Sequence, residues 1–234
     1  MCLYSYSLHA QIGELVEHRI IENKKDTILI ISPHPDDGEI FAGGSIIKHI
    51  KNNDYIVEVF ITSGEKAKRV KNISDEELAI IREEEATKVA NYMHINEIIF
   101  LKFPDGAVDY KNIYIDIDQL IKKYNPDIIY TSEFINPFYN HNDHIVTGKV
   151  VHDIVNSLKE KKIKLRYYDY IVKPRGNNIF IKIDINKKNE ALLLYRSQYK
   201  EVILSLTLLS ALEKSYGIKM LDFTSHYEAF RSEH

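Results

Sequence analysis

The stretch TILIISPHPDDGEIFAGG, residues 27–44, decides which fold this sequence can adopt. Its first part, Thr27–Pro33, is a nearly continuous apolar run, which predicts a strand buried on both faces, as in a parallel sheet covered by helices. The part from Glu39 onward predicts a helix that ends near Asn52. Between them, one histidine, two adjacent aspartates and a glutamate lie within six residues. Carboxylates repel one another at the end of a buried strand, so this crowding calls for a chemical reason.

The rest of the chain continues an alternation of strands and helices to about Leu158. Three further strands and three further helices are expected, at residues 55–64, 97–103 and 127–132 and at residues 74–93, 113–125 and 144–160. This pattern predicts an α/β fold with a mainly parallel sheet. The sequence contains no internal repeat or obvious linker, so we expect a single domain over residues 1–234.

The two ends of the chain depart from the alternation. Residues 1–25 are expected to form a helical extension outside the main fold, because residues 11–21 place apolar side chains at helical spacing. This extension could cover a face of the sheet, shape the rim of a site or make an oligomer contact. Near the other end, residues 165–173 and 177–185 predict two strands, paired through a turn at 174–178. Helices are expected after them.

Composition excludes several classes of function. A formal net charge of -3 gives no basic surface, so nucleic acid is not an expected partner. No stretch approaches the roughly 20 apolar residues of a membrane span, and the N-terminus does not resemble a signal peptide. The single Cys2 cannot form an internal disulfide, which suits a cytoplasmic location.

Polar stretches follow all four predicted strands. They are residues 34–39, 62–64, 103–106 and 131–144. Because sites in such sheets lie beyond the carboxyl ends of the strands, we expect the four stretches to converge on one edge.

Two of these stretches carry metal-binding chemistry. HPDD and HNDH together offer three histidines and three aspartates, His34, Asp36, Asp37, His141, Asp143 and His144. Imidazole and carboxylate groups suit Zn²⁺ or another first-row divalent cation. Such a cation would neutralise the crowded carboxylates. Each motif alone could be a helix cap or a polar loop, but their joint position favours a metal site.

Asp36 and Asp37 are expected to differ in role, because adjacent side chains point in different directions. One can bind the cation while the other faces its water as a general base. The glycines of FAGG, at residues 41–44, lack the Gly-x-Gly-x-x-Gly spacing of a dinucleotide-binding loop. A nucleotide-binding module is therefore disfavoured, and the two glycines are expected to allow close helix packing.

The ordered motifs resemble the PIG-L/LmbE family of zinc-dependent N-deacetylases. They are HPDDGE (34–39), FAGGSI (41–46), ITSGE (61–65), FPDG (103–106) and HNDH (141–144). Gly38 is inserted before the glutamate, as in one form of the family motif. ALLLYRSQY (191–199) and HYEAF (226–230) are similar to later family elements. The resemblance implies an LmbE-like, Rossmann-like three-layer sandwich.

The resemblance also implies roles for site residues. His34, Asp37 and His144 match metal ligands, with Zn²⁺ expected and Fe²⁺ or Co²⁺ also acceptable to this ligand set. Asp36 matches the general base that activates the metal-bound water. His141 matches a residue that stabilises the oxyanion or protonates the leaving amine.

The resemblance also implies roles for Asp143, for Asp105 and for Arg82, which lies in IIREEE (80–85). Asp143 matches a position that orients a neighbouring histidine. Arg82 and Asp105 resemble positions that hold sugar hydroxyls, although Arg82 could pair with Glu84 or Glu85 instead, and Asp105 could belong to a plain turn.

Three more residues in or beside these motifs have alternative interpretations. Glu39 is expected to be a charge at a helix N-terminus rather than a ligand. Phe138 and Tyr139 could stack on a sugar ring or pack their own loop.

The implied activity is removal of the acetyl group from an N-acetylglucosamine-type amino sugar or its conjugate. An amidase of the same family acting on a thiol conjugate or another non-sugar amide would carry the same motifs. A non-catalytic α/β binding domain is the alternative from another class, and the intact set of histidines and aspartates argues against it.

Overall fold

The computed structural model describes residues 16–17, 25–67, 73–135, 141–158, 163–168, 178–219, 222 and 224–232. At its centre is a five-stranded sheet whose neighbouring strands are all parallel, in the order β4-β3-β2-β5-β6. The strands are β2 (Thr27–Ser32), β3 (Tyr55–Thr62), β4 (Glu97–Phe103), β5 (Ile128–Ser132) and β6 (Lys164–Tyr168). The predicted parallel α/β sheet is confirmed.

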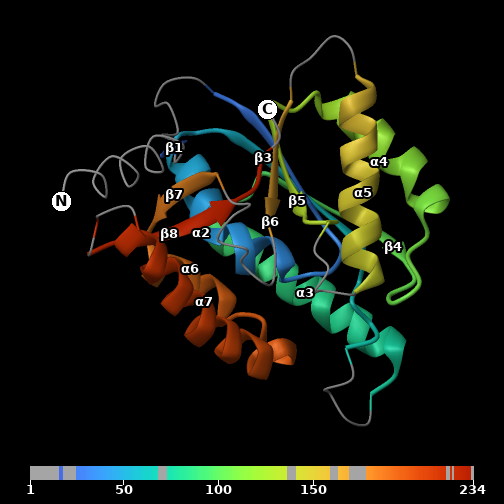
Figure 1. Ribbon diagram of the computed structural model, residues 1–234. Helices are drawn as coiled ribbons and strands as arrows, with labels where there is room; N and C mark the ends of the chain where they lie inside the picture. Colours follow the sequence, from blue (N-terminus) through green and yellow to red (C-terminus); the bar gives the residue numbers. More distant parts are fainter. Residues whose placement is uncertain are drawn as a thin grey trace.

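Helices cover both faces of this sheet, which gives three layers (Figure 1). One face packs against α2 (Asp37–Lys51) and α3 (Asp75–Met93), and the other against α4 (Tyr110–Tyr124) and α5 (Asn142–Ser157). Successive residues of β2 alternate between the two cores: Ile28 and Ile30 face α2, whereas Leu29 and Ile31 face α4 and α5. This two-sided burial explains the continuous apolar run in the sequence.

Local sequence signals account for the helix ends. Ser74 caps α3 through a capping box with Glu77, whose backbone N–H donates to the Ser74 hydroxyl. Asp109 caps α4 by accepting from two backbone N–H groups. The α2 helix begins differently, because its N-cap residue, Asp36, makes no side-chain capping bond and has φ 103°.

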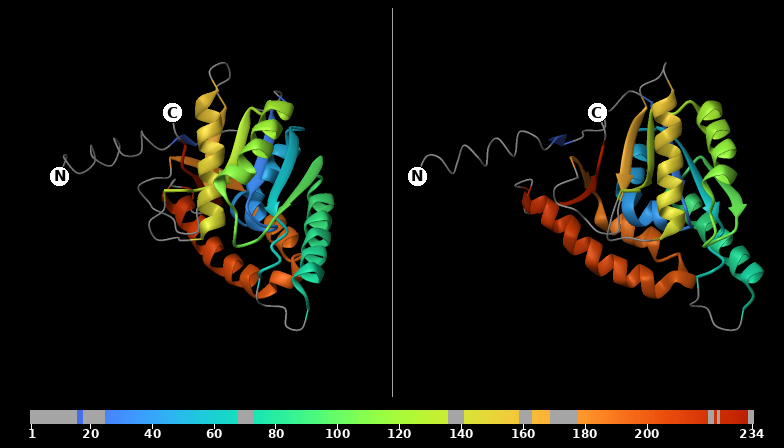
Figure 2. Two further views of the ribbon diagram at one scale, coloured as in Figure 1. Left: turned by 90° about the vertical axis from the view of Figure 1, so that its right-hand side faces the viewer. Right: turned by 45° about the vertical axis from the view of Figure 1, so that its right-hand side comes forward.

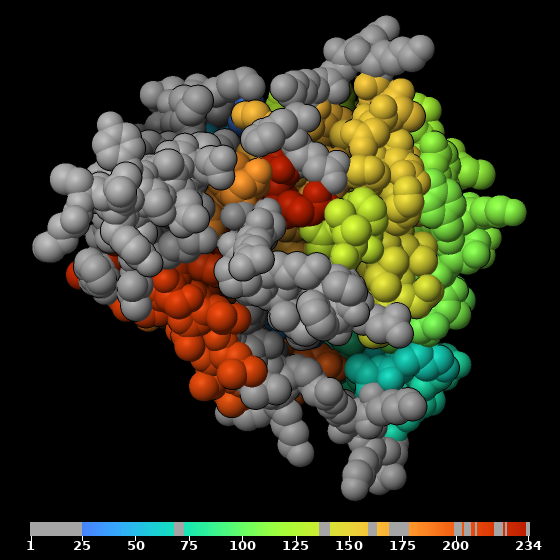
Figure 3. All heavy atoms as spheres, viewed as in Figure 1, coloured from blue at the N-terminus to red at the C-terminus, as the bar shows by residue number. Residues whose placement is uncertain are grey.

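A second, three-stranded sheet lies beside α2, in the order β1-β7-β8. Its strands are β1 (Val16–Glu17), β7 (Ile179–Ile183) and β8 (His226–Phe230). The chain between β7 and β8 forms α6 (Ile185–Leu192), the 3₁₀ helix η1 (Arg196–Gln198) and α7 (Tyr199–Lys219). In Figure 2, α7 is the long orange-red helix on the opposite side of the molecule from α4 and α5. The same helices form opposite parts of the surface in Figure 3.

Two expectations about the ends of the chain require correction. Strands β6 and β7 do not form a hairpin: β6 extends the main sheet beside β5, and β7 pairs with β8. The reason is that β6 has an apolar residue for each core, Tyr167 on one face and Tyr168 on the other. Val16–Glu17, expected in a helix, pair instead with β7 as a short parallel strand. The remainder of the expected extension, residues 1–15 and 18–24, lies outside the described residues.

Candidate metal centre and active site

The candidate site lies at the carboxyl edge of the main sheet. His34, Asp36 and Asp37 follow β2 and enter α2, and Asp105 follows β4. HNDH begins at the N-cap of α5, directly beyond the loop that follows β5. Contacts join six of the eight residues singled out in the sequence, all through His34 or Asp37. The other two, Arg82 and Asp36, contact each other, and Asp36 is the chain neighbour of Asp37.

Asp37 lies between two histidines. Its Oδ2 atom is 3.1 Å from Nδ1 of His34 and 3.3 Å from Nε2 of His144. Ligand atoms of these three residues all lie within 4.8 Å of one another. Two imidazoles and a carboxylate at this spacing are a donor set that fits zinc or a similar divalent cation. The chain's own residues thus fit a metal site.

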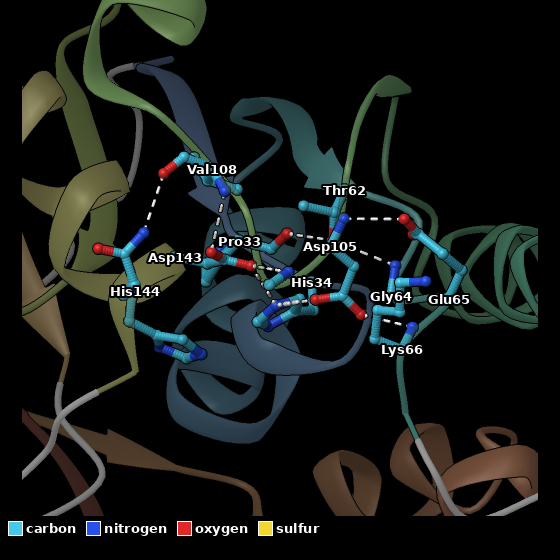
Figure 4. A network of polar contacts seen from close by, with 12 residues as sticks. Pro33, His34, Thr62, Gly64, Glu65, Lys66, Asp105, Val108, Asp143 and His144 are labelled. Atoms are coloured by element: carbon cyan, nitrogen blue, oxygen red, sulfur yellow. Dashed lines mark hydrogen bonds and ion pairs between the residues drawn. The ribbon is translucent and has the colours of Figure 1, made fainter. Parts of the chain in front are cut away.

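The other ring nitrogen of His34 faces two more carboxylates. Nε2 is 3.0 Å from Oδ1 of Asp105 and 3.3 Å from Oδ2 of Asp143 (Figure 4). A histidine that donates its second N–H to a carboxylate has a fixed tautomer and ring orientation, which suits a metal ligand. His34, His141 and Asp143 also form an overlapping group whose donor atoms are within 4.8 Å of one another.

Asp143 is fully buried and connects two parts of the site. Besides His34, its carboxylate accepts hydrogen bonds from the backbone N–H of Gly106 at 2.7 Å and of Val108 at 3.2 Å. It therefore fastens the loop after β4 to the first turn of α5 (Figure 4). This geometry agrees with an orienting role for Asp143.

Burial and neighbouring charges shift the pKa values of this cluster in different directions. Burial lowers the pKa of His144 to about 4, although Asp37 opposes the shift. Burial also raises the pKa of Asp36 to about 7, against the opposing charge of Arg82. For Asp37, burial acts upward, but His144 and His34 outweigh it and hold the pKa below its usual value. The adjacent aspartates thus occupy different electrostatic environments.

Arg82 approaches Asp36 from helix α3. Its Nη2 atom lies 3.3 Å from Oδ2 of Asp36. The alternative expectation, that Arg82 pairs with Glu84 or Glu85 of its own helix, is wrong. Glu85 instead accepts hydrogen bonds from the backbone and hydroxyl of Ser197, and Glu84 pairs with Lys88.

Asp105 is part of the site's polar network rather than a plain turn. Besides contacting His34, it accepts a hydrogen bond from the backbone N–H of Lys66 at 2.8 Å, and its own N–H donates to Glu65. His141, in contrast, is exposed, and its ring centroid is 5.0 Å from that of His34. The predicted aromatic pair, Phe138 and Tyr139, lies outside the described residues.

The burial of two glutamates, Glu39 and Glu58, was not anticipated from the sequence. Glu39 lies in the first turn of α2, where a charge was expected, but it is fully buried and accepts a hydrogen bond from the Tyr195 hydroxyl at 2.6 Å. Glu58 of β3 is also fully buried, and burial raises its pKa well above its usual value. A Cβ atom on Gly38 would lie 2.6 Å from Glu58 Oε1, so the inserted glycine makes room for this carboxyl. The sequence signal was a lone glutamate within the apolar run of β3.

Comparisons with known proteins agree with this architecture. The family model described as PIG-L, GlcNAc-PI de-N-acetylase, matches residues 29–155, more than half of the chain. The chain is 25% identical to a probable N-acetyl-alpha-D-glucosaminyl L-malate deacetylase 2 from Bacillus anthracis over 185 residues, which cover 74% of this chain and 81% of that protein. It is 31% identical to a diacetylchitobiose deacetylase from Thermococcus kodakarensis over 127 residues, 54% of this chain and 48% of that one.

A solved structure is similar over the whole chain. The N,N'-diacetylchitobiose deacetylase from Pyrococcus horikoshii, complexed with its inhibitor MPG, matches with a TM-score of 0.81 at 21% identity. The match covers 100% of this chain and 93% of the other. At this level of identity, the likeness establishes the shared fold.

Proposed function

Because this chain belongs to the PIG-L family, we propose that it is a metal-dependent hydrolase that removes the acetyl group from an N-acetylglucosamine-type amino sugar or its conjugate. The observation that carries the proposal is that a histidine from HPDD and a histidine from HNDH both contact the carboxylate of Asp37. Asp37 Oδ2 lies within 3.3 Å of ring nitrogens from both motifs. The activities named for the two curated relatives, on a glucosaminyl malate and on diacetylchitobiose, support an amino sugar as substrate.

His34, Asp37 and His144 are the residues that would hold the cation. Zn²⁺ suits two imidazoles and a carboxylate, and Fe²⁺ or Co²⁺ can use the same donors. A bound divalent cation would supply Lewis acidity, which polarises an acyl carbonyl and lowers the pKa of water towards about 7. Asp143 and Asp105, which face the other nitrogen of His34, would keep that ring in one tautomer.

Asp36 would act as the general base. It is the neighbour of a proposed ligand, but its carboxylate contacts Arg82 rather than the histidines of the site. Asp36 is not in the group that could hold the cation, and we propose that it accepts the proton of the water that attacks the acetyl carbonyl. The C–O bond forms as this proton passes to Asp36.

His141 would serve the second half of the reaction. It is exposed at the N-cap of α5, and its ring lies beside those of His34 and His144. From there it can donate a hydrogen bond to the developing oxyanion or a proton to the departing amine. The C–N bond then breaks, and acetate and the free amino sugar are released. Asp105 remains our candidate for accepting a hydrogen bond from a sugar hydroxyl.

Three further proposals concern the whole protein. Residues 1–234 are proposed to form one deacetylase domain, with residues 1–25 as an extension that could contribute to a homo-oligomer. A cytoplasmic location is proposed because the single Cys2 suits a reducing compartment. Among the described residues, no helix is long and apolar enough to cross a bilayer.

Acetate release tests the proposed function. The protein is stripped with chelator, reloaded with Zn²⁺, Fe²⁺ or Co²⁺, and assayed on N-acetylglucosamine, diacetylchitobiose, N-acetylglucosaminyl malate and an N-acetylated amine without a sugar. We expect metal-dependent release from at least one sugar and little from the sugar-free amide. Faster release from the sugar-free amide would indicate the non-sugar amidase. Failure to bind any metal would favour the non-catalytic binding domain.

A further inference from the structure

Arg82 is buried although it belongs to a helix with an exposed face. Its side chain is 4% exposed. Nη1 donates a hydrogen bond to the carbonyl oxygen of Gly64 at 2.9 Å, and Nη2 donates to the carbonyl oxygen of Pro35. Nη2 is also 3.3 Å from the carboxylate of Asp36. One guanidinium group therefore connects the loop after β2 with the loop after β3.

The backbone at Asp36 needs such support. Its φ of 103° lies in a region that residues other than glycine rarely adopt. Backbone conformations of this kind cost on the order of 1–3 kcal/mol and persist only where surrounding contacts hold them. Arg82 supplies contacts on both sides of the strained φ angle, to the carbonyl group of Pro35 before it and to the side chain of Asp36 itself.

The second loop is shaped to receive the guanidinium group. Gly64 has φ 68°, and a Cβ atom there would lie 2.3 Å from Nη1 of Arg82. A side chain at position 64 would therefore displace Arg82 from its place beside Asp36. The planar fork of arginine can reach two carbonyl groups and a carboxylate at once, which a lysine ammonium on a flexible stem cannot do with the same fixed geometry.

We propose that Arg82 is a positioning residue that holds the strained Asp36 and aims its carboxylate, rather than a residue that binds sugar hydroxyls. This inference rests on the proposed function, because it gives Arg82 its effect through the general base. It differs from the role that the sequence resemblance implies. The two terminal nitrogens of Arg82 are already engaged with the protein, and almost none of its surface is open to a substrate.

Steady-state kinetics distinguishes a residue that positions the base from a residue that binds the sugar. A group that aims the base affects the chemical step, whereas a group that binds the sugar in ground state and transition state alike affects KM. We therefore expect Arg82→Gln to lower kcat about 100-fold with KM changed less than about threefold, since a well-placed base contributes about 10²–10⁴-fold. A KM about tenfold higher with kcat preserved would overturn the proposal.

A double-mutant cycle tests whether Arg82 acts through Asp36. In an Asp36→Asn background there is no base to aim, so Arg82→Gln should reduce the residual rate by less than about threefold. Equal losses in the two backgrounds would overturn the proposal. Lys88→Ala is the matched control, because Lys88 is exposed on the same helix and pairs only with Glu84 in the described structure. It should leave kcat and KM unchanged.

Crystal structures of the metal-loaded variants provide a readout that does not depend on activity. In Arg82→Gln, we expect the metal to remain and the Asp36 carboxylate or backbone to move. An unmoved Asp36 overturns the proposal. If Arg82→Gln does not fold, Arg82→Lys replaces it in all three measurements, with the same expected direction. Wild type and Lys88→Ala that both release no acetate would refute the proposed function, whereas active controls with a KM effect alone would refute only the role of Arg82.

Discussion

Asp36 and Asp37 show how two adjacent carboxylates can be accommodated at the end of a buried strand. Asp37 contacts two imidazoles, and Asp36 contacts a guanidinium group. Each carboxylate has its own direct contacts, and the charges of Arg82 and His34 favour the ionised form of both, which offsets their mutual repulsion. The crowding in the sequence is explained by a division of roles between neighbours.

Asp143 allows a prediction at the residue scale. Asp143→Asn should weaken metal binding about 10–100-fold, because groups that orient a ligand histidine typically contribute that much to affinity. Competition with a chromogenic chelator measures the affinity. Asp153→Asn is the control, since Asp153 lies on the same helix but pairs with Lys149 and Tyr110 away from the site. Equal affinity of Asp143→Asn and wild type would contradict an orienting role.

Helix α2 carries the proposed base and ligand and is anchored along its length by buried polar groups. In its middle, Gly44 and Ser45 donate backbone hydrogen bonds of 2.8 Å to the carboxylate of Glu228 on β8. The Ser45 hydroxyl donates to the same carboxylate, and Lys188 pairs with it at 2.8 Å. The small sheet is thereby joined to the helix that presents the site.

Glu228→Gln should destabilise the fold by about 2 kcal/mol, because it removes the charge that accepts three hydrogen bonds from Gly44 and Ser45 and leaves Glu213 to balance the buried Lys188 ammonium. The Glu228 and Lys188 side chains are both almost fully buried, so solvent cannot replace the lost partner. Urea unfolding of the metal-free protein measures the change. Glu84→Gln, at an exposed surface pair, should change stability by less than about 1 kcal/mol. A Glu228 variant as stable as this control would show that the contacts of Glu228 contribute little to stability.

The other end of α2 gives a prediction for pH dependence. Burial raises the pKa of Asp54, but hydrogen bonds from His49 and from the Asp26 N–H outweigh it, so the net pKa is lowered. Stability from this group is therefore present above the unfolded-state pKa of about 3.9 and lost as pH falls through the lower folded-state value. Asp54→Asn should cost about 2 kcal/mol at pH 7.

The difference between Asp54→Asn and wild type should shrink below about pH 4, where the aspartate becomes protonated. Urea unfolding at a series of pH values measures both proteins under the same conditions. The exposed pair of Asp118 with Lys122 provides a control, and Asp118→Asn should differ little from wild type at any pH. A constant difference for Asp54→Asn from pH 7 to pH 3 would contradict the assignment.

At the scale of the whole molecule, local sequence patterns predicted the order of strands and helices, but not every pairing between strands that are distant in the chain. Continuous apolar runs such as Thr27–Ser32 predicted the inner strands of the parallel sheet, and carboxyl-edge geometry predicted which loops meet. The pairing of β7 with β8 was not predictable, because 42 residues lie between Ile183 and His226 in the chain and nothing local records their contact.

The sequence predicted which residues form the site, but not which of their atoms contact one another. The motifs identified the residues that gather at the sheet edge, since the strand order brings their loops together. Which carboxylate faces Arg82, and which ring nitrogen of His34 faces Asp105, depend on side-chain rotamers and on the strained backbone at Asp36. Sequence spacing contains no information on either.

Metal binding should stabilise the whole chain. A ligand that binds only the folded state at about 100 times its Kd adds about 2.7 kcal/mol of stability. Thermal unfolding with and without Zn²⁺ should therefore show a higher Tm in the loaded wild type, reversed by chelator. His144→Ala removes a proposed ligand and should show a much smaller shift. Equal shifts in both proteins would place the bound metal elsewhere.

The central claim is that Asp36 performs chemistry beside a metal that other residues hold. The most direct measurement is acetate release and metal content in the same samples of wild type and Asp36→Asn. We predict one metal per chain in both proteins, with turnover of the variant lower by about 10²–10⁴-fold. An Asp36→Asn variant that turns over like wild type, or that loses the metal together with activity, would contradict the account.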